Sequence, residues 1–348
     1  MKIRVIVSSV ILLALPVLIA GQARAPQAPP APCVAGNTQF VCGQNAPEDL
    51  VIVPGGEWVV ATSFAGSGGI QVIGVRDRRA ILAYPTAASR EQLDKKTYDT
   101  CPGAPDAEQK SMFRTHGIAL REGRNSVHTV YVVNHGKRES IEVFELDAKP
   151  RPPALTWVGC VVAPDPVGLN EVVPLPDGGF IATDFLARNI STEARGRMMA
   201  GESNGGLWEW HSGRGWKMIP GSEAAGANGL EISKDGKTLY VAAWGSQSFF
   251  RFPLGQPNAK RESVPLGFRA DNVRWAPDGS LFVTGQGGNG PMQTTNIVKI
   301  HPDTLKVTEV LVRPNSPEFG AGTVTVQVGK ELWVGSYRGD RIATFPAP

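Results

Sequence analysis

Short apolar runs bounded by turns recur along the whole chain and predict β-strands. Each run is rich in β-branched residues and lacks the three-and-four spacing of an amphipathic helix. The runs group into similar units, in which a polar residue opens a first strand and a turn such as Pro176-Asp177-Gly178 leads to a second. Six units are recognisable by their opening residues: Asp49, His116, Asn170, Asn228, Asn272 and Thr323.

A unit repeated six times predicts an all-β, six-bladed β-propeller with four-stranded blades. The mean spacing of about 50 residues is close to the length of one four-stranded blade. The last unit, which ends at 340–346, is one strand short. We therefore expect residues 37–42 to supply the missing strand, so that N- and C-terminal strands close the ring. A pair of β-sandwiches is the alternative, although it gives no reason for similar units.

Composition agrees with many short strands joined by turns. The 348 residues include 40 Gly and 28 Pro, and both residue types interrupt helices. Helical bundles and coiled coils are therefore excluded.

The first 25 residues have the layout of a bacterial signal peptide. Lys2 and Arg4 precede an apolar run, and Ala23-Arg24-Ala25 offers a small-x-small cleavage site. A retained membrane anchor is the alternative, but the run is shorter than the ~20 residues of a spanning helix. The organisation expected is a signal peptide at 1–25, a Pro-rich spacer at 26–36 and one propeller domain at 37–348.

Loss of this leader changes the meaning of the net charge. The formal charge of +3 becomes neutral once Lys2, Arg4 and Arg24 are removed. No basic arm remains, so nucleic acid is not an expected partner. We expect an exported protein, periplasmic or secreted, with no stable membrane anchor after cleavage.

Export favours pairing of the four cysteines, because thiols oxidise in such compartments. Four cysteines allow three connectivities. We favour Cys33–Cys42, which closes a short loop, and Cys101–Cys160, which ties an insertion to a strand. One or more buried free thiols remain an alternative. A zinc site is disfavoured, because the chain has no C-x-x-C pair and no two histidines at metal-ligand spacing.

Polar residues occupy equivalent positions at the start of each inner strand. Such positions gather around the axis of a propeller at one face. The set is rich in carboxylates and amides: Glu48, Asp49, His116, Asn170, Asn228, Asp271, Asn272 and Thr323. Any single one could merely cap a turn. Together, their oxygen atoms suit a hard cation, and a flexible set of six or seven oxygens suits Ca²⁺.

Written with their neighbours, these residues resemble the paraoxonase/arylesterase family and, more loosely, the SMP-30/gluconolactonase-like propellers. Each motif is short, but their order along the chain is that of the family. The matching motifs are Pro47-Glu48-Asp49-Leu50, Thr115-His116-Gly117-Ile118, Val132-Val133-Asn134-His135, Gly168-Leu169-Asn170-Glu171, Ala227-Asn228-Gly229-Leu230 and Ala270-Asp271-Asn272-Val273.

The resemblance implies a catalytic calcium and a histidine pair. The implied ligands are Glu48, Asn170, Asn228, Asp271 and Asn272, and the pair is His116 and His135. It also implies a second, structural calcium, for which Asp49, the Ile118 carbonyl and Glu171 are the candidates. Asp184 falls where the family carries an acid near the calcium, but Phe185 replaces the family's histidine. The family's disulfide between the chain ends is absent, because no Cys follows Cys160.

The function expected is calcium-dependent hydrolysis of lactones or aryl esters. A bound Ca²⁺ would polarise the carbonyl, His116 would accept a proton from water, and His135 would orient His116. One alternative is a gluconolactonase-type sugar lactonase that uses the same ligands, with Zn²⁺, Mn²⁺ or Ca²⁺, and no histidines. A non-catalytic propeller that binds a ligand or protein is another, since fold does not dictate function.

Overall fold

The computed structural model describes residues 33–35, 38–66, 68–256 and 260–348. Residues 33–348 form one compact unit. The predicted signal peptide and residues 26–32 of the predicted spacer lie outside the described residues. Within the described ranges, no helix has the length and apolar character needed to cross a membrane.

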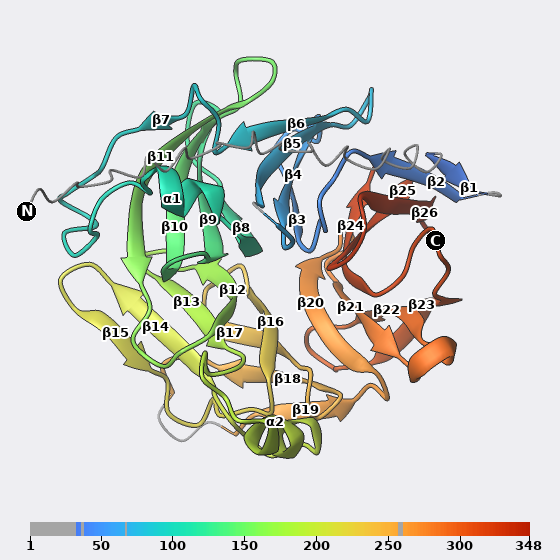
Figure 1. Ribbon diagram of the computed structural model, residues 1–348. Helices are drawn as coiled ribbons and strands as arrows, with labels where there is room; N and C mark the ends of the chain where they lie inside the picture. Colours follow the sequence, from blue (N-terminus) through green and yellow to red (C-terminus); the bar gives the residue numbers. More distant parts are fainter. Residues whose placement is uncertain (1–32, 36–37, 67, 257–259) are drawn as a thin grey trace, which may run out of the picture. The chain divides into compact units, whose positions relative to one another are not determined.

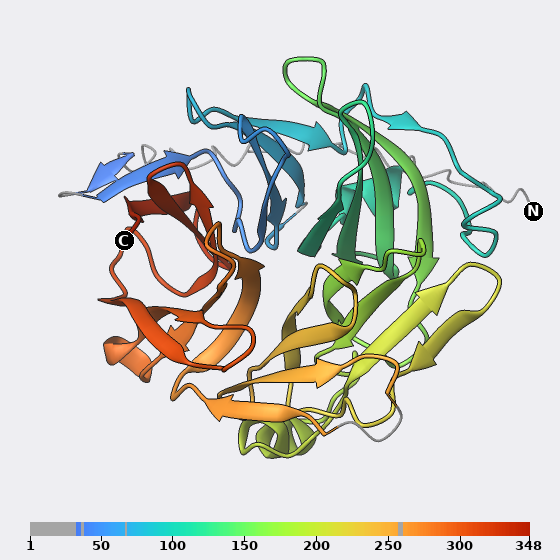
Figure 2. The ribbon, with the colours of Figure 1, turned by 180° about the vertical axis from the view of Figure 1, so that it is seen from behind.

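Six sheets surround a common centre and confirm the six-bladed propeller (Figure 1). In each sheet one strand lies nearest the centre, and the following strands of that sheet lie progressively farther out, as the view from behind also shows (Figure 2). Each inner strand contacts the next, in the order β3, β8, β12, β16, β20 and β24, and β24 contacts β3 again. The inner strands therefore form a closed ring around the axis.

The first three blades contain residues 50–218. Blade one has β3 (Leu50–Ile52), β4 (Trp58–Ser63), β5 (Gly69–Gly74) and β6 (Ala80–Tyr84). Blade two has β8 (Thr115–Arg121), β9 (Val127–His135), β10 (Glu139–Asp147), β11 (Ala154–Val162) and the short parallel strand β7 (Arg90–Glu91). Blade three has β12 (Leu169–Pro174), β13 (Phe180–Asp184), β14 (Leu207–His211) and β15 (Gly215–Met218).

The other three blades contain residues 227–346 and the N-terminal strands. Blade four has β16 (Ala227–Ile232), β17 (Thr238–Ala243), β18 (Ser248–Pro253) and β19 (Glu262–Pro265). Blade five has β20 (Arg269–Trp275), β21 (Leu281–Gly287), β22 (Thr294–Ile300) and β23 (Val307–Pro314). Blade six has β24 (Gly322–Val328), β25 (Glu331–Ser336), β26 (Arg341–Pro346), β2 (Thr38–Cys42) and β1 (Val34–Ala35).

The ring closes between the two ends of the described chain, as predicted. β2 pairs with β26 in antiparallel register, and Val41 lies opposite Ile342. Val41 packs in a cluster with residues of blades one and six, and Phe40 packs with residues of blades five and six. The predicted Cys33–Cys42 disulfide is present and joins β2 to the start of β1. β1 itself lies within the stretch expected to be spacer.

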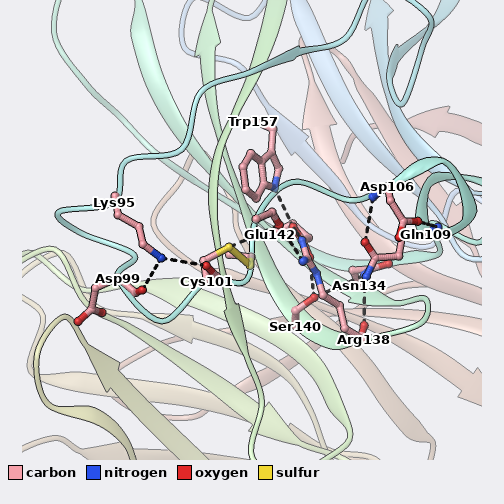
Figure 3. The surroundings of a disulfide bond; sticks show 12 residues. Lys95, Asp99, Cys101, Asp106, Gln109, Asn134, Arg138, Ser140, Glu142 and Trp157 are labelled. Atoms are coloured by element: carbon pink, nitrogen blue, oxygen red, sulfur yellow. Dashed lines mark hydrogen bonds and ion pairs between the residues drawn. A yellow bond between two sulfur atoms is a disulfide. The ribbon is translucent and has the colours of Figure 1, made fainter.

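The second predicted disulfide, Cys101–Cys160, attaches the 92–114 segment to blade two. Beside it, the buried Glu142 accepts two hydrogen bonds from Arg138, at 2.7 and 2.8 Å, and one from Trp157 at 2.8 Å. Figure 3 shows these side chains turned toward Glu142, next to Cys101. Arg138 also donates to the Gly103 carbonyl at 2.9 Å, so the disulfide and the ion pair hold the same segment.

Two short helices were not predicted from the apolar pattern. α1 (Ala107–Ser111) starts from a capping box between Asp106 and Gln109, and α2 (Thr192–Met199) is capped by Ser191. Both lie in long connections between strands, and α1 buries no residue while α2 buries only Met198. Such helices have little apolar periodicity, so only their N-caps identify them in the sequence. A 3₁₀ turn, η1 (Gly290–Met292), completes the regular elements.

Candidate functional site

A β-bulge at the same place in five inner strands positions the candidate residues. In each strand the register shifts across two residues near the N-terminal end. The first residues of these pairs are His116, Asn170, Asn228, Asp271 and Thr323. A bulge re-aims side chains that a regular strand would alternate between faces. In the first blade, Glu48 lies just before β3 and joins the same group.

Glycine occupies the second bulge position in two of these strands. A Cβ atom at Gly117 would overlap the Asn170 carbonyl oxygen, and one at Gly229 would overlap the Asp271 carbonyl oxygen. The close approach of β8 to β12, and of β16 to β20, therefore requires that these two positions carry no side chain.

Four buried side-chain oxygens in this group have no hydrogen-bond partner among the described residues. They are Glu48 Oε2, Asn170 Oδ1, Asn228 Oδ1 and Asn272 Oδ1. The four residues are at most 3% exposed. An unpaired buried polar atom costs about 1–3 kcal/mol, so these four oxygens would be stabilised by a positively charged partner.

Short contacts connect these residues to one another. Asn272 Nδ2 donates to Glu48 Oε1 at 2.7 Å, and Asn170 Nδ2 lies 3.4 Å from His116 Nε2. His116 Nε2 is in turn 3.6 Å from Glu48 Oε2. Three of the five predicted calcium ligands and His116 thus belong to one contiguous group. We define the axial cluster as Glu48, His116, Asn170, Asn228, Asp271 and Asn272.

Asp271 completes the axial cluster as its second carboxylate. Its Oδ2 accepts a hydrogen bond from Gln286 at 2.6 Å, and Asn228 also donates to its side chain. Burial raises the pKa of Asp271 to about 7. Burial and the charges of Asp271 and Asp49 raise the pKa of Glu48 well above its usual value. Two carboxylates that repel each other in a dry site are each stabilised in the charged form by a cation.

The donor set fits an oxygen-binding cation. It consists of two carboxylates and three amide oxygens, which suit Ca²⁺ better than Zn²⁺. Throughout the part of the chain that the structure describes, no three His, Cys, Asp or Glu side chains group as metal ligands. The amides of Asn170, Asn228 and Asn272 therefore have to supply the remaining ligands.

The two predicted histidines lie beside the axial cluster and contact each other. His116 Nδ1 is 2.7 Å from His135 Nε2, and His135 Nδ1 is 3.0 Å from both carboxylate oxygens of Glu139. Glu139 also accepts a hydrogen bond from the Leu169 backbone at 2.7 Å. Burial, His135 and Arg114 hold the pKa of His116 well below its usual value of 6.5, so the ring is neutral at pH 7. The Phe64 ring lies 4.4 Å from the His116 ring.

The three groups predicted for a second calcium also gather, around a residue that was not predicted. Asp49 Oδ2, Glu171 Oε2 and the Ile118 carbonyl all accept hydrogen bonds from Nη2 of Arg274. Arg274 lies two residues after Asn272 on β20 and is 6% exposed.

Asp184 is separate from these groups. It is partly buried at the end of β13, and its Oδ1 accepts a hydrogen bond from the Gly168 backbone at 3.2 Å. Burial raises the pKa of Asp184 to about 6. The described contacts give it no direct link to the axial cluster.

Sequence reasoning missed three polar residues that support the site. Glu139 lies opposite His135 across a hairpin, and Arg274 is a basic residue within an inner strand. Both residues could have been noticed in the sequence, because a charged residue within a buried strand requires a partner of opposite charge. Gln286, which bridges Asp271 and the Gly322 carbonyl, follows an apolar run and gives no such signal.

Comparison with known proteins shows a shared fold. The sequence matches no protein family profile and no curated protein. A gluconolactonase from Xanthomonas campestris is similar in structure, with 16% identity, a TM-score of 0.55 and coverage of 90% of this chain and 91% of that one. Regucalcin from Agrobacterium tumefaciens, a calcium-binding protein, has 13% identity, a TM-score of 0.54 and coverage of 88% and 92%.

A third similar structure is virginiamycin B lyase from Staphylococcus aureus, with 11% identity, a TM-score of 0.51 and coverage of 90% and 99%. The shared architecture therefore accommodates proteins with different names and activities. At such low identity, the function of this chain has to be argued from its own site.

Proposed function

We propose that this protein is an exported, calcium-dependent hydrolase of lactones or aryl esters. The observation that carries the proposal is the set of four unpaired, buried oxygens in the axial cluster. Glu48, Asn170, Asn228, Asp271 and Asn272 would hold the metal. When bound there, Ca²⁺ would supply a positive charge that polarises an ester carbonyl and stabilises the oxyanion.

The hydrogen-bond chain beside the cluster supports His116 as the general base. Neutral His116 with its proton on Nδ1 donates to His135 Nε2, and His135 donates its own Nδ1 proton to Glu139. This arrangement leaves His116 Nε2 unprotonated, 3.4 Å from the Asn170 amide. His116 Nε2 would accept a proton from the attacking water, whose oxygen bonds to the carbonyl carbon. The bond between the carbonyl carbon and the alcohol oxygen would then break, and the proton would pass from His116 to that oxygen.

His135 and Glu139 would act as positioning residues. Glu139 would stabilise the positive charge that forms on the histidine pair when His116 is protonated. In catalytic triads of other enzymes, a third residue orients the catalytic base in the same way. The Phe64 ring against His116 limits access of bulk water from that side.

Metal binding and turnover can be tested separately. Calorimetric titration of the chelator-treated protein should show calcium binding at micromolar concentrations, and Glu48→Gln should weaken it. His116→Gln should lower kcat for γ-lactones and phenyl acetate by about 100-fold or more, the usual contribution of a general base. Calcium affinity should remain near that of the wild type.

His301→Gln, an exposed histidine in the turn after β22, is the matched control and should retain full turnover. Unchanged turnover of His116→Gln would remove this residue from the mechanism. Absence of metal binding would contradict the hydrolase proposal and favour a non-catalytic binding propeller.

A gluconolactonase-type activity is the second candidate, and the Xanthomonas campestris structure supports testing it. Its substrates would be aldonolactones, and the metal could be Ca²⁺, Zn²⁺ or Mn²⁺. Turnover of aldonolactones that survives His116→Gln would favour this alternative. The hydrogen-bond chain from His116 through His135 to Glu139 supports the first candidate, because the Glu139 carboxylate can balance the charge of a protonated histidine pair.

The export proposal rests on the predicted leader, and the two disulfides are compatible with it. Expression in a bacterial host with an intact secretion system should yield a mature N-terminus at Pro26.

A further inference from the structure

A second buried group of charges lies along the axis, next to the axial cluster. Asp49, just before β3, and Glu171, on β12, are completely buried carboxylates on either side of β8, which carries the Ile118 carbonyl. Two acids in such a place require a positive charge, because an uncompensated buried carboxylate is strongly destabilising. The family resemblance suggested that a calcium ion supplies it.

The structure places the guanidinium of Arg274 among these acceptors. Arg274 Nη2 donates to the Ile118 carbonyl at 2.9 Å, to Glu171 Oε2 at 3.0 Å, and to Asp49 Oδ2. Nε donates to the Leu50 carbonyl at 3.2 Å, and Nη1 donates to the Val273 carbonyl at 2.8 Å. Every nitrogen of the guanidinium therefore has an acceptor.

The remaining carboxylate oxygens are also satisfied by the chain itself. Asp49 Oδ1 accepts from the Leu50 backbone at 2.8 Å, and Glu171 Oε1 accepts from the Val172 backbone at 2.9 Å. None of these oxygens is among the buried, unpaired atoms of the described residues. The axial cluster shows the opposite pattern, with four unpaired oxygens. Of the two groups of described residues on the axis, the axial cluster is therefore the one with unpaired oxygens that could bind a cation.

We propose that Arg274 is the resident cation of this second position and takes the place of a structural metal ion. The protein then binds one divalent metal, at the axial cluster, and no second ion on the axis. This inference goes beyond the proposed activity. The role of Arg274 does not depend on that activity, since its contacts exist whatever the axial cluster binds, whereas the count of one metal ion rests on the proposed calcium site.

Arg274 also has a structural role, because of its position among the inner strands. Its contacts join β20 to β3, β8 and β12, and its Nη1 lies 4.0 Å from Glu231 on β16. One side chain thus connects the inner strands of five blades. A metal ion in this place could be removed by a chelator, whereas a covalently attached guanidinium cannot. The contacts that Arg274 makes between the inner strands should therefore persist when a chelator is added.

The number of bound calcium ions tests the proposal. Native mass spectrometry and equilibrium dialysis with Ca²⁺ should give one ion per wild-type chain. Arg274→Ala removes the guanidinium and leaves Asp49, Glu171 and the Ile118 carbonyl free, so this variant should bind one additional ion. Its melting temperature should rise with added Ca²⁺ more than that of the wild type.

Arg274→Lys, which keeps a positive charge, is the matched control and should gain no ion. Two ions on the wild-type chain, or no gained ion in a folded Arg274→Ala, would overturn the proposal. If Arg274→Ala does not fold, the number of calcium ions bound by Glu171→Gln provides the test. The same number as in the wild type supports the proposal, and one ion fewer overturns it.

These results also separate this proposal from the proposed function. A wild-type chain that binds no calcium contradicts the calcium-dependent hydrolase, while the ion gained by Arg274→Ala would still support the role of Arg274. Loss of the wild-type ion in Glu48→Gln would assign that ion to the axial cluster.

Discussion

At the scale of single residues, burial decides what each carboxylate of this protein can do. Glu142 is buried but receives three hydrogen bonds from Arg138 and Trp157, so its charge is compensated by the chain. Glu48 is equally buried and has one unpaired oxygen, so its charge remains available to a ligand. Identical side chains are thus fully paired in one blade and partly unpaired at the axis, according to their partners.

Asp184 offers a prediction about pH and stability. Because burial raises its pKa from 3.8 to about 6, the stability that it contributes is complete below pH 3.8 and is lost as pH rises through 6. Asp184→Asn mimics the protonated form. In chelator, its free energy of unfolding should equal that of the wild type near pH 4. At pH 7.5 it should exceed the wild type by at most about 3 kcal/mol.

Asp278→Asn provides a control of opposite sign. Lys299 and Ser280 lower the pKa of Asp278 to about 2, so its contribution is present above pH 3.8 and is lost as pH falls through 2. This variant should be the less stable protein at pH 7.5. Chemical denaturation at both pH values measures the two differences, and a pH-independent difference for Asp184→Asn would contradict the raised pKa.

At the scale of elements, the repeated β-bulge positions the side chains of the candidate site. It places one side chain from each of five inner strands at the same level of the axis. The bulge also brings adjacent strands together where Gly117 and Gly229 lack side chains. The geometry of the axial cluster therefore depends on backbone spacing as well as on the ligands themselves.

Gly229→Ala should test this dependence. The added Cβ would overlap the Asp271 carbonyl and crowd the Asn272 backbone, so β16 and β20 must move apart. We expect a loss of about 1–3 kcal/mol of stability, as for overpacked cores, together with weaker calcium binding. Thermal unfolding and calorimetry measure the two effects.

Gly196→Ala is the matched control, because its Cβ would meet no atom within 4 Å and it lies in α2. Alanine there should leave calcium affinity unchanged and add up to about 1 kcal/mol of helix stability. Normal calcium affinity in a folded Gly229→Ala would show that the bulge tolerates a wider spacing.

At the scale of the whole ring, stability depends on the strand that joins its ends. β2 is separated from β26 by most of the chain, yet it completes blade six, and Val41 and Phe40 pack in the apolar clusters that this blade shares with blades one and five. Propeller blades leave only short edges, and pairing of β2 covers the edge of β26 in the last blade.

Val41→Asp should therefore destabilise the complete ring. It places an unpaired carboxylate at a position with no solvent exposure, which costs about 3–5 kcal/mol by analogy with broken buried ion pairs. We expect the single unfolding transition, followed by near-ultraviolet circular dichroism, to shift to lower temperature. Gln39→Asp, on the exposed face of the same strand, should change stability by less than about 0.5 kcal/mol.

An unshifted main transition in Val41→Asp, with only early proteolysis near residue 40, would instead show that the closing strand frays independently of the ring.

The sequence by itself determined the features that local order along the chain encodes. Alternating apolar runs and turns predicted the strands and their grouping in six blades. The incomplete last unit predicted a closing strand at 37–42, which the structure shows as β2, Thr38–Cys42. Equivalent positions before the inner strands identified Glu48, Asn170, Asn228 and His116 as candidates. Such inferences succeed because strand periodicity and repeat spacing depend on near neighbours.

Only the tertiary structure decided how the polar residues are partnered. Arg274 contacts Asp49, which lies 225 residues earlier in the sequence, and Asn272 contacts Glu48 across 224 residues. The structure thereby separates acids that look alike in sequence: Asp49 and Glu171 are paired with a guanidinium, while Glu48 keeps an unpaired oxygen. The physical reason is that a buried charge is compensated by whatever group folding brings next to it, at any distance along the chain.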